Sequence, residues 1–187
     1  MADLVTKWAA RVAETELSAV LPRRWVHTQG VTERAIGIRQ LLGEDAGLLT
    51  AAATLHDVGY APRLAVTGFH PLDGARFLRD EHGADDRLVR LVANHSFALL
   101  EAEERGLRDE LASEFPLLDD PLLVDALVYC DMTTTPDGGR TSVQERIAEI
   151  ISRYGEDSVV GRFIRRAAPQ ILSSVRRIEA TLAAQPR

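Results

Sequence analysis

The sequence predicts an all-α fold, a bundle of about eight helices in one domain over residues 1–187. Three observations support this prediction. Apolar residues recur at intervals of three and four positions along most of the chain, which is the period of an amphipathic helix. No segment alternates apolar and polar residues as a half-buried strand would. A length of 187 residues suits a single domain, and no change in composition marks an internal boundary.

Two amphipathic helices are expected at the start of the chain. The first covers about twenty residues and closes at Pro22. The second covers residues 23–42, and its apolar stripe begins at His27. Charged residues are mixed through the apolar positions of the first segment, so we expect a helix there and not a secretory signal.

The third helix, residues 45–58, is the most apolar one. Its small and apolar residues continue until His56 is followed by Asp57, and Gly59 then supplies a helix stop. Residues 60–69 contain Pro and Gly and read as a loop. A carboxylate buried at this helix end needs a positive partner, and no basic residue lies within five positions of Asp57.

Two further helices are expected to begin at capping residues. His70 precedes a proline, which favours the first helical position, so His70 should cap a helix that ends near Gly83. Asp85 or Asp86 should cap the next helix, whose apolar stripe ends on His95.

A charged segment and a second buried stripe follow. Residues 101–114 read as a mostly exposed helix. A proline opens the next helix at Pro121, and its apolar stripe ends on Asp131. Residues 133–139 are rich in Thr, Pro and Gly and predict a loop.

The C-terminal region predicts two helices, residues 142–155 and 159–184, the second interrupted or kinked at Pro169. The second helix carries a heptad-like apolar stripe made of Ile164, Ala168, Ile171, Val175, Ile178 and Leu182. The stripe could form the seam of a homodimer, but packing on the chain's own core is the favoured interpretation.

Composition and charge exclude several classes of function. The chain has 22 basic and 28 acidic residues, and a net charge of −6 argues against a general nucleic-acid binder. The longest uncharged runs are about ten residues, well short of the ~17–25 that span a membrane. Cys130 is the single cysteine, so no internal disulfide forms and a cytoplasmic location is expected.

Six side chains on the expected helices can bind a metal ion. They are His27, His56, Asp57, His70, His95 and Asp131. Each one taken alone has a structural explanation, because a single histidine on an apolar face is usually hydrogen-bonded in the core. Six buried polar groups without a shared partner would each cost roughly 1–3 kcal/mol, against a total stability of about 5–15 kcal/mol. A shared cation satisfies all six, so the residues indicate a metal site.

The ordered pattern His27, His56-Asp57 and Asp131, on three separate helices, resembles the HD-domain superfamily of metal-dependent phosphohydrolases. The additional His70 and His95 resemble the subset that holds two metal ions. The resemblance covers more than half of the chain. It implies a metal-site core at about residues 23–135, on which the C-terminal helices of residues 142–184 pack.

The resemblance also implies the roles of these residues. His27, His56, Asp57 and Asp131 would hold one ion, and Asp57 would bridge to a second ion held by His70 and His95. The cofactor would be one or two divalent ions of iron, manganese or zinc, and these nitrogen and oxygen ligands do not choose among them. The enzyme would be a phosphomonoesterase or phosphodiesterase that hydrolyses a small phosphorylated compound, such as a nucleotide, through a metal-bound hydroxide. Asp57, His70 and His95 would be its catalytic residues, the two histidines serving as general acid or phosphate contact if only one ion binds.

One residue departs from the family pattern. Many of these phosphohydrolases have lysine where this chain has Tyr60, three residues after Asp57. A tyrosine offers one neutral hydroxyl, so other cations must meet the phosphate. The candidates for substrate binding, besides the Tyr60 hydroxyl, are Arg63, Arg76 and Arg140, each of which also fits a solubilising surface arginine.

Two alternative functions use the same residues. Some superfamily members with the six-ligand pattern hold a mixed-valent di-iron centre and cleave their substrate with oxygen, and Tyr60 in place of lysine favours this chemistry. The other alternative is a non-catalytic module that senses a nucleotide or metabolite with an intact site.

Overall fold

The computed structural model of the chain describes residues 2–184, and these residues are all-α, as predicted. The helices are α1 (Ala2–Leu17), α2 (Pro22–Gly37), α3 (Ala46–Leu55), α4 (His70–Asp80), α5 (Asp86–Asn94), α6 (Ala98–Glu104), α7 (Arg108–Glu114), α8 (Pro121–Met132), α9 (Val143–Tyr154) and α10 (Val159–Ala183). The only β-type pairing among the described residues is an isolated antiparallel bridge between Thr134 and Arg140. The predicted helix over residues 101–114 is two helices, α6 and α7, because the chain turns at Gly106, where φ is +72°.

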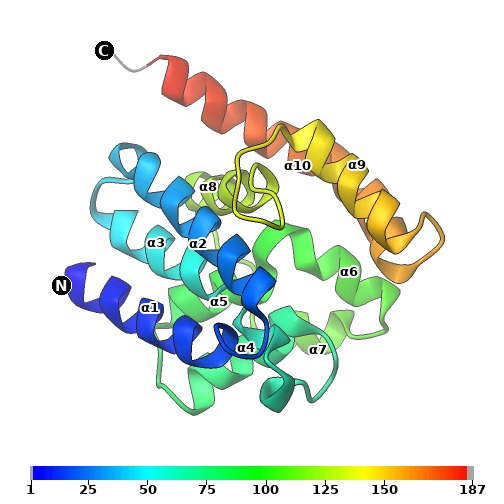
Figure 1. Cartoon of the computed structure of the whole chain (residues 1–187), viewed down its shortest axis with the longest axis horizontal. Coiled ribbons are helices and arrows are strands. Elements are labelled where there is room, and N and C mark those ends of the chain that lie inside the picture. The colour runs from blue at the N-terminus through cyan, green and yellow to red at the C-terminus, as the bar shows by residue number, and fades with distance from the viewer. Residues whose placement is uncertain (1, 185–187) are drawn as a thin grey trace.

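Helix α3 lies at the centre of the fold. It packs against α1, α2, α5 and α8, and Figure 1 shows it between α1 and α2. Its residues 49–55 are all buried, so the helix has no solvent-facing side over that length. The small residues of this segment allow the close approach of neighbouring helices. The end of α3, where His56 follows, therefore lies in the interior.

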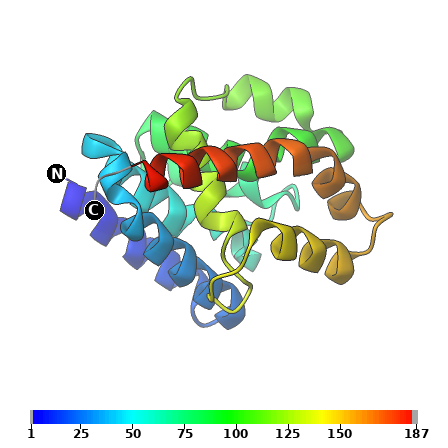
Figure 2. The ribbon, with the colours of Figure 1, turned by 90° about the horizontal axis from the view of Figure 1, so that it is seen from above.

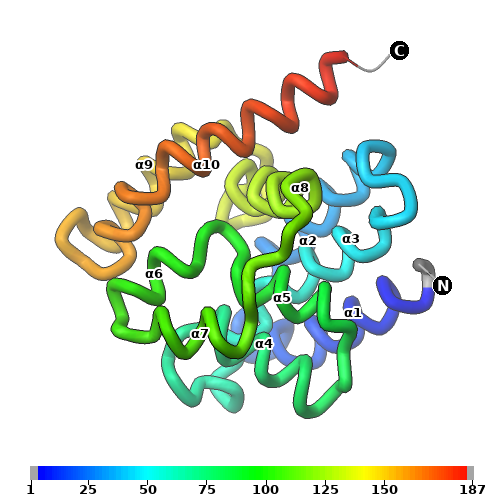
Figure 3. The backbone as a smooth tube through the Cα atoms, turned by 180° about the vertical axis from the view of Figure 1, so that it is seen from behind, coloured from blue at the N-terminus to red at the C-terminus, as the bar shows by residue number. Residues whose placement is uncertain are grey.

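Helices α9 and α10 cover one side of α8. Seen from above in Figure 2, α10 runs across α8 with α9 beside it. Figure 3 shows from behind that α6 also lies next to this helix pair. In the predicted stripe, Ile164, Ile171, Val175 and Ile178 are buried within the chain. Of the two predicted outcomes at Pro169, an interruption or a kink, the interruption is wrong, since α10 continues as one helix through this exposed residue.

Several predicted boundaries need correction. The second helix ends at Gly37, and the 3-10 turn Arg39–Leu41 replaces its predicted last turn. His70 is the first residue of α4 and does not cap it, because Phe69 holds the cap position. Gly59 is not the stop of α3, which ends at Leu55.

Gly59 instead permits a close approach between two segments. A Cβ atom at this position would lie 2.0 Å from the carbonyl oxygen of His70 and 2.5 Å from the backbone nitrogen of Gly74. The 3-10 turn Val58–Tyr60 therefore packs directly on the first turns of α4. This contact fixes Asp57 relative to His70.

None of the helices within residues 2–184 is long and apolar enough to cross a membrane.

Candidate metal centre

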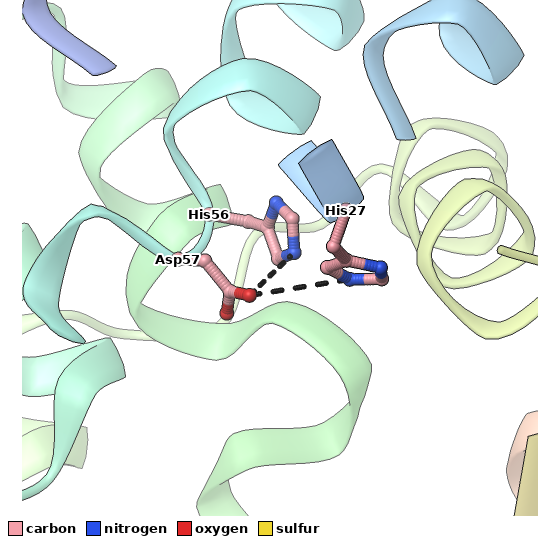
Figure 4. A group of neighbouring side chains, drawn as sticks. All are labelled: His27, His56 and Asp57. Carbon is pink, nitrogen blue, oxygen red and sulfur yellow. Dashed lines mark ion pairs between the residues drawn. The ribbon is translucent and has the colours of Figure 1, made fainter. Parts of the chain in front are cut away.

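The six predicted ligands converge at one place in the interior. They come from α2 (His27), the two residues after α3 (His56 and Asp57), the start of α4 (His70), the residue after α5 (His95) and α8 (Asp131). All are buried except His70, which is partly buried. Figure 4 shows His27 and His56 directed at Asp57, with their Nε2 atoms 3.9 and 3.4 Å from Oδ2.

The groups fall on the two sides of the Asp57 carboxylate. Oδ2 faces His27 and His56, while Oδ1 lies 3.4 Å from Nε2 of His70. His70 and His95 meet through their Nε2 atoms at 3.2 Å. Each set of three, Asp57 with His27 and His56 or Asp57 with His70 and His95, offers ligand atoms within 4.8 Å of one another. This is the geometry that a bridging carboxylate between two cations requires.

Asp131 completes the first side. Its Oδ1 lies 3.3 Å from Nε2 of His27 and 3.9 Å from Nε2 of His56. Its other oxygen accepts a short hydrogen bond from the hydroxyl of Ser96. Ser96 and Phe97 have positive φ angles of 49° and 64°, a strained conformation for residues with a side chain. This tight turn between α5 and α6 delivers Ser96 to Asp131, and nothing in the sequence pattern indicated it.

Backbone carbonyl groups orient three of the imidazoles. Nδ1 of His27 donates to the Thr135 carbonyl at 2.9 Å, and Nδ1 of His56 donates to the Ala53 carbonyl at 2.8 Å. Nδ1 of His95 donates to the Val92 carbonyl at 2.7 Å. The neutral form of each ring then carries its lone pair on Nε2, which faces the cluster.

His56 provides the test of whether a metal fits. Its Nε2 is buried and has no hydrogen-bond partner among the described residues. A buried polar atom without a partner costs about 1–3 kcal/mol. A cation bound between His56, Asp57 and Asp131 would supply the missing partner, so the donor set fits a divalent metal.

The charge states also suit a metal site. Burial alone would raise the pKa of Asp57, but Arg24 and His56 hold it well below its usual range. Burial lowers the pKa of His70 and of His95, so these rings stay neutral. Burial would lower the pKa of His56 too, but Asp57 and Asp131 outweigh it and raise that pKa to about 9. The two carboxylates thus favour positive charge beside Nε2 of His56, which is where a cation would bind.

Arg24 is a site residue that the sequence analysis missed. Its Nη1 donates to Oδ2 of Asp57 at 2.6 Å, and its guanidinium lies 3.7 Å from the centre of the Tyr60 ring. Tyr60 in turn stacks on His70, with ring centres 3.8 Å apart. Arg24 precedes His27 by three residues on α2, a spacing that places both on one helix face. The spacing was therefore a signal in the sequence.

A cavity of about 180 Å³ opens on the cluster. His27, Asp57, Tyr60, His70, His95 and Asp131 line it, and Ile150, Tyr154 and Phe163 of the C-terminal helices close its other side. Its cations are Arg24, Arg105, Arg146 and Arg153. A neighbouring cavity of about 290 Å³ shares Arg24, His27, Arg146 and Arg153 as its wall.

The three arginines predicted to bind substrate do not line either cavity. Arg63 pairs with Glu16 of α1 at 2.6 Å, and Arg76 pairs with Glu110 and Glu114 of α7. Arg140 is exposed, and its backbone forms the bridge with Thr134. Their positions do not support the predicted contact with substrate, since tertiary ion pairs or solvent direct these side chains away from the cluster.

Comparison with known proteins agrees with this geometry. Residues 24–132 match the family model described as HD domain, and this range contains all six converging residues. Among curated proteins, a tRNA (cytidine(56)-2'-O)-methyltransferase of Thermoplasma volcanium is 40% identical over 78 residues. The match covers 42% of this chain and 22% of that protein, so the chain spans about a fifth of the length of this relative. No solved structure matches the chain.

Proposed function

The chain belongs to the HD domain family, and from this premise we propose that it is a metal-dependent phosphohydrolase that acts on a small phosphorylated compound such as a nucleotide. The observation that carries the proposal is the convergence of three oriented imidazoles on two buried carboxylates, with Nε2 of His56 left without a partner. The similarity to part of a methyltransferase supplies no argument for the substrate, because it covers only 22% of that protein.

The residues on each side of Asp57 would hold the cations. His27, His56, Asp57 and Asp131 would hold one, while Asp57, His70 and His95 would hold a second. When bound, such ions supply Lewis-acid activation of water and of the phosphoryl group. Ser96 would keep the Asp131 carboxylate oriented, and the carbonyl groups of Ala53, Val92 and Thr135 would keep the imidazoles in the ligand tautomer.

Arg24 would take the role of the lysine that many of these phosphohydrolases have at the position of Tyr60. Its guanidinium lies between Asp57 and the Tyr60 ring and borders the cavity. A guanidinium there can donate to a phosphoryl oxygen and stabilise negative charge that grows in the transition state. Tyr60, stacked on His70, would hold that imidazole in place and exclude water from its face. The small size of the cavity favours a small substrate.

The test compares the wild-type protein with a His56→Ala, Asp57→Ala double variant. Bound iron, manganese and zinc are measured by mass spectrometry, and phosphate release is measured over a panel of phosphate esters with each metal. We expect metal in the wild type only and a loss of hydrolysis of roughly 100-fold or more in the double variant. His82→Ala removes an exposed histidine outside the cavity and serves as the control. Equal hydrolysis by wild type and double variant would contradict the proposal.

Measurements of oxygen consumption and nucleotide binding, added to this test, distinguish two alternative functions. Tyr60 in the position of the lysine also favours a di-iron oxygenase with the same six ligands. That function predicts bound iron, oxygen consumption with substrate and no release of phosphate from simple esters. A protein that binds nucleotides tightly and turns none over would instead be a sensing module.

A further inference from the structure

Arg146 of α9 is a buried cation with incomplete hydrogen bonding. The residue is 6% exposed, and its Nε has no hydrogen-bond partner among the described residues. Its Nη1 donates a short hydrogen bond to Glu149 on the same helix. Guanidinium donors that are removed from water normally find acceptors. Arg146 therefore has a donor to offer to a ligand.

Arg153 adds a second guanidinium to the same place. It follows Arg146 by seven residues, which is two helical turns, and both side chains line the cavity at the cluster and its neighbour. Nε of Arg153 lies 3.3 Å from Glu149, so one carboxylate serves both cations. Asp131 and Asp137 add negative charge near Arg146 and Arg153, so both guanidinium groups lie close to carboxylates while Nε of Arg146 keeps no acceptor among the described residues.

Arg146 and Arg153 lie in the C-terminal part of the chain. The match to the HD domain ends at residue 132, whereas Arg146 and Arg153 belong to α9. Both arginines border the same two cavities as His27, which is one of the converging imidazoles. An anion that contacts them would thus lie beside the cluster without occupying it.

We propose that Arg146 and Arg153 form a subsite for a second anionic group of the substrate, a phosphate or a carboxylate. The proposal rests on the proposed function, in which the reacting phosphate lies at the cluster. It narrows the substrate class to small phosphate esters that carry a further anionic group. A guanidinium suits this role because its planar donors match the oxygen atoms of phosphate and carboxylate.

The first experiment measures anion binding without catalysis. Inorganic pyrophosphate is titrated calorimetrically into the full chain in buffer with EDTA, so that activity is not needed. We expect binding by the wild type, at least tenfold weaker binding by Arg146→Gln and by Arg153→Gln, and unchanged binding by Arg165→Gln. Arg165 lies on α10, outside both cavities, and is the matched control.

The side chain of Arg153 is 32% exposed, so its variant keeps the test valid if Arg146→Gln fails to fold. No binding by the wild type, or equal binding by the wild type and Arg153→Gln, would overturn the subsite.

The second experiment measures specificity with three related esters. Glycerol 1-phosphate has no second anionic group, 3-phosphoglycerate adds a carboxylate, and 2,3-bisphosphoglycerate adds both a carboxylate and a phosphate. We expect the wild type to favour one of the latter two by at least tenfold in kcat/KM, and that preference to fall at least tenfold in Arg153→Gln. Which ester is favoured identifies the second group.

The two proposals fail in different ways. Hydrolysis of all three esters with equal kcat/KM would overturn the subsite and leave the phosphohydrolase intact. If no phosphate ester is hydrolysed with any metal, the proposed function fails, and the pyrophosphate titration alone decides whether the anion subsite exists.

Discussion

Asp57 is balanced by the Arg24 guanidinium, 2.6 Å from its Oδ2, and by the proposed cation. Both compensate the charge of a carboxylate that is only 3% exposed. When one of them is present, loss of the other should therefore cost less stability. The two contributions should therefore be coupled. Arg23, the neighbouring residue, pairs with Asp137 on the surface and offers a matched control.

We predict that Arg24→Gln destabilises the fold by roughly 3 kcal/mol in EDTA, because it leaves Asp57 uncompensated. With metal present the loss should be smaller by at least ~1 kcal/mol, since the cation then supplies positive charge. Urea unfolding with and without metal measures both values. Arg23→Gln should change the free energy of unfolding by under ~1 kcal/mol in either buffer. If metal does not reduce the loss of unfolding free energy caused by Arg24→Gln, Arg24 and the cation do not both compensate the charge of Asp57.

Cys130 should be unreactive in the folded protein. It is fully buried beside Asp131, and burial raises the pKa of its thiol. Because the thiolate is the reactive form, a higher pKa and lack of access both slow its reaction with a disulfide reagent at pH 8. We expect one thiol to react only when the protein is unfolded in denaturant, as measured by absorbance. Rapid reaction under native conditions would show that the region around α8 opens.

Single residues also mark the limits of sequence reasoning. The six converging residues were predictable because His27, His56, His95 and Asp131 start or end apolar stripes, Asp57 follows His56, and His70 precedes a proline at a helix start. Arg63 and Arg76 were predicted to contact substrate, but nearness in sequence does not fix side-chain direction, and their ion-pair partners come from α1 and α7. Arg146 and Arg153 could not be identified, because the face that α9 turns inward depends on its docking to α8 and α10.

At the scale of elements, backbone carbonyl groups at helix ends orient two of the histidine rings. His56 and His95 each donate from Nδ1 to a carbonyl three residues earlier, one of the carbonyl groups that a helix end leaves unpaired. This part of the site is local and follows from the sequence. The partner of His27 is Thr135, 108 residues away, and comes from the loop after α8. No local pattern predicts that contact, nor the strained turn at Ser96 and Phe97.

The contact of the 3-10 turn with α4 gives a prediction for Gly59. A Cβ atom there would lie 2.0 Å from the His70 carbonyl oxygen, so Gly59→Ala must separate Asp57 from His70. We expect a loss of about 3 kcal/mol in the free energy of unfolding and weaker metal binding. Gly37 is the control, because a Cβ atom at the end of α2 meets nothing within 4 Å. Gly37→Ala should leave metal binding intact and change stability by under ~1 kcal/mol. Normal metal binding by Gly59→Ala would contradict the role of this contact.

At the scale of the whole molecule, two parts of the chain form different sides of the site. The part that matches the HD domain, residues 24–132, supplies the six converging side chains, and α9 and α10 cover the cavity beside them. The all-α class and the order of the helices followed from apolar periodicity. The sequence pattern did not predict that the C-terminal helices close the cavity, because this depends on how α10 lies across α8 and α6.

Metal should stabilise the whole fold. A ligand that binds only the folded state adds about 2.7 kcal/mol when its free concentration is 100 times Kd. We therefore predict that the thermal midpoint of the wild type rises when divalent metal is added after EDTA treatment. The His56→Ala, Asp57→Ala double variant should show no such rise. An equal rise in both proteins would mean that the metal binds elsewhere.

The most direct measurement is anomalous diffraction from crystals of the metal-loaded protein, recorded at the absorption edges of iron, manganese and zinc. We predict a strong peak within ligand distance of Nε2 of His27 and His56 and of Oδ2 of Asp57, and, if two ions bind, another beside Oδ1 facing His70 and His95. Ordered side chains at this place with no peak at any edge would contradict the metal centre from which the proposed activity follows.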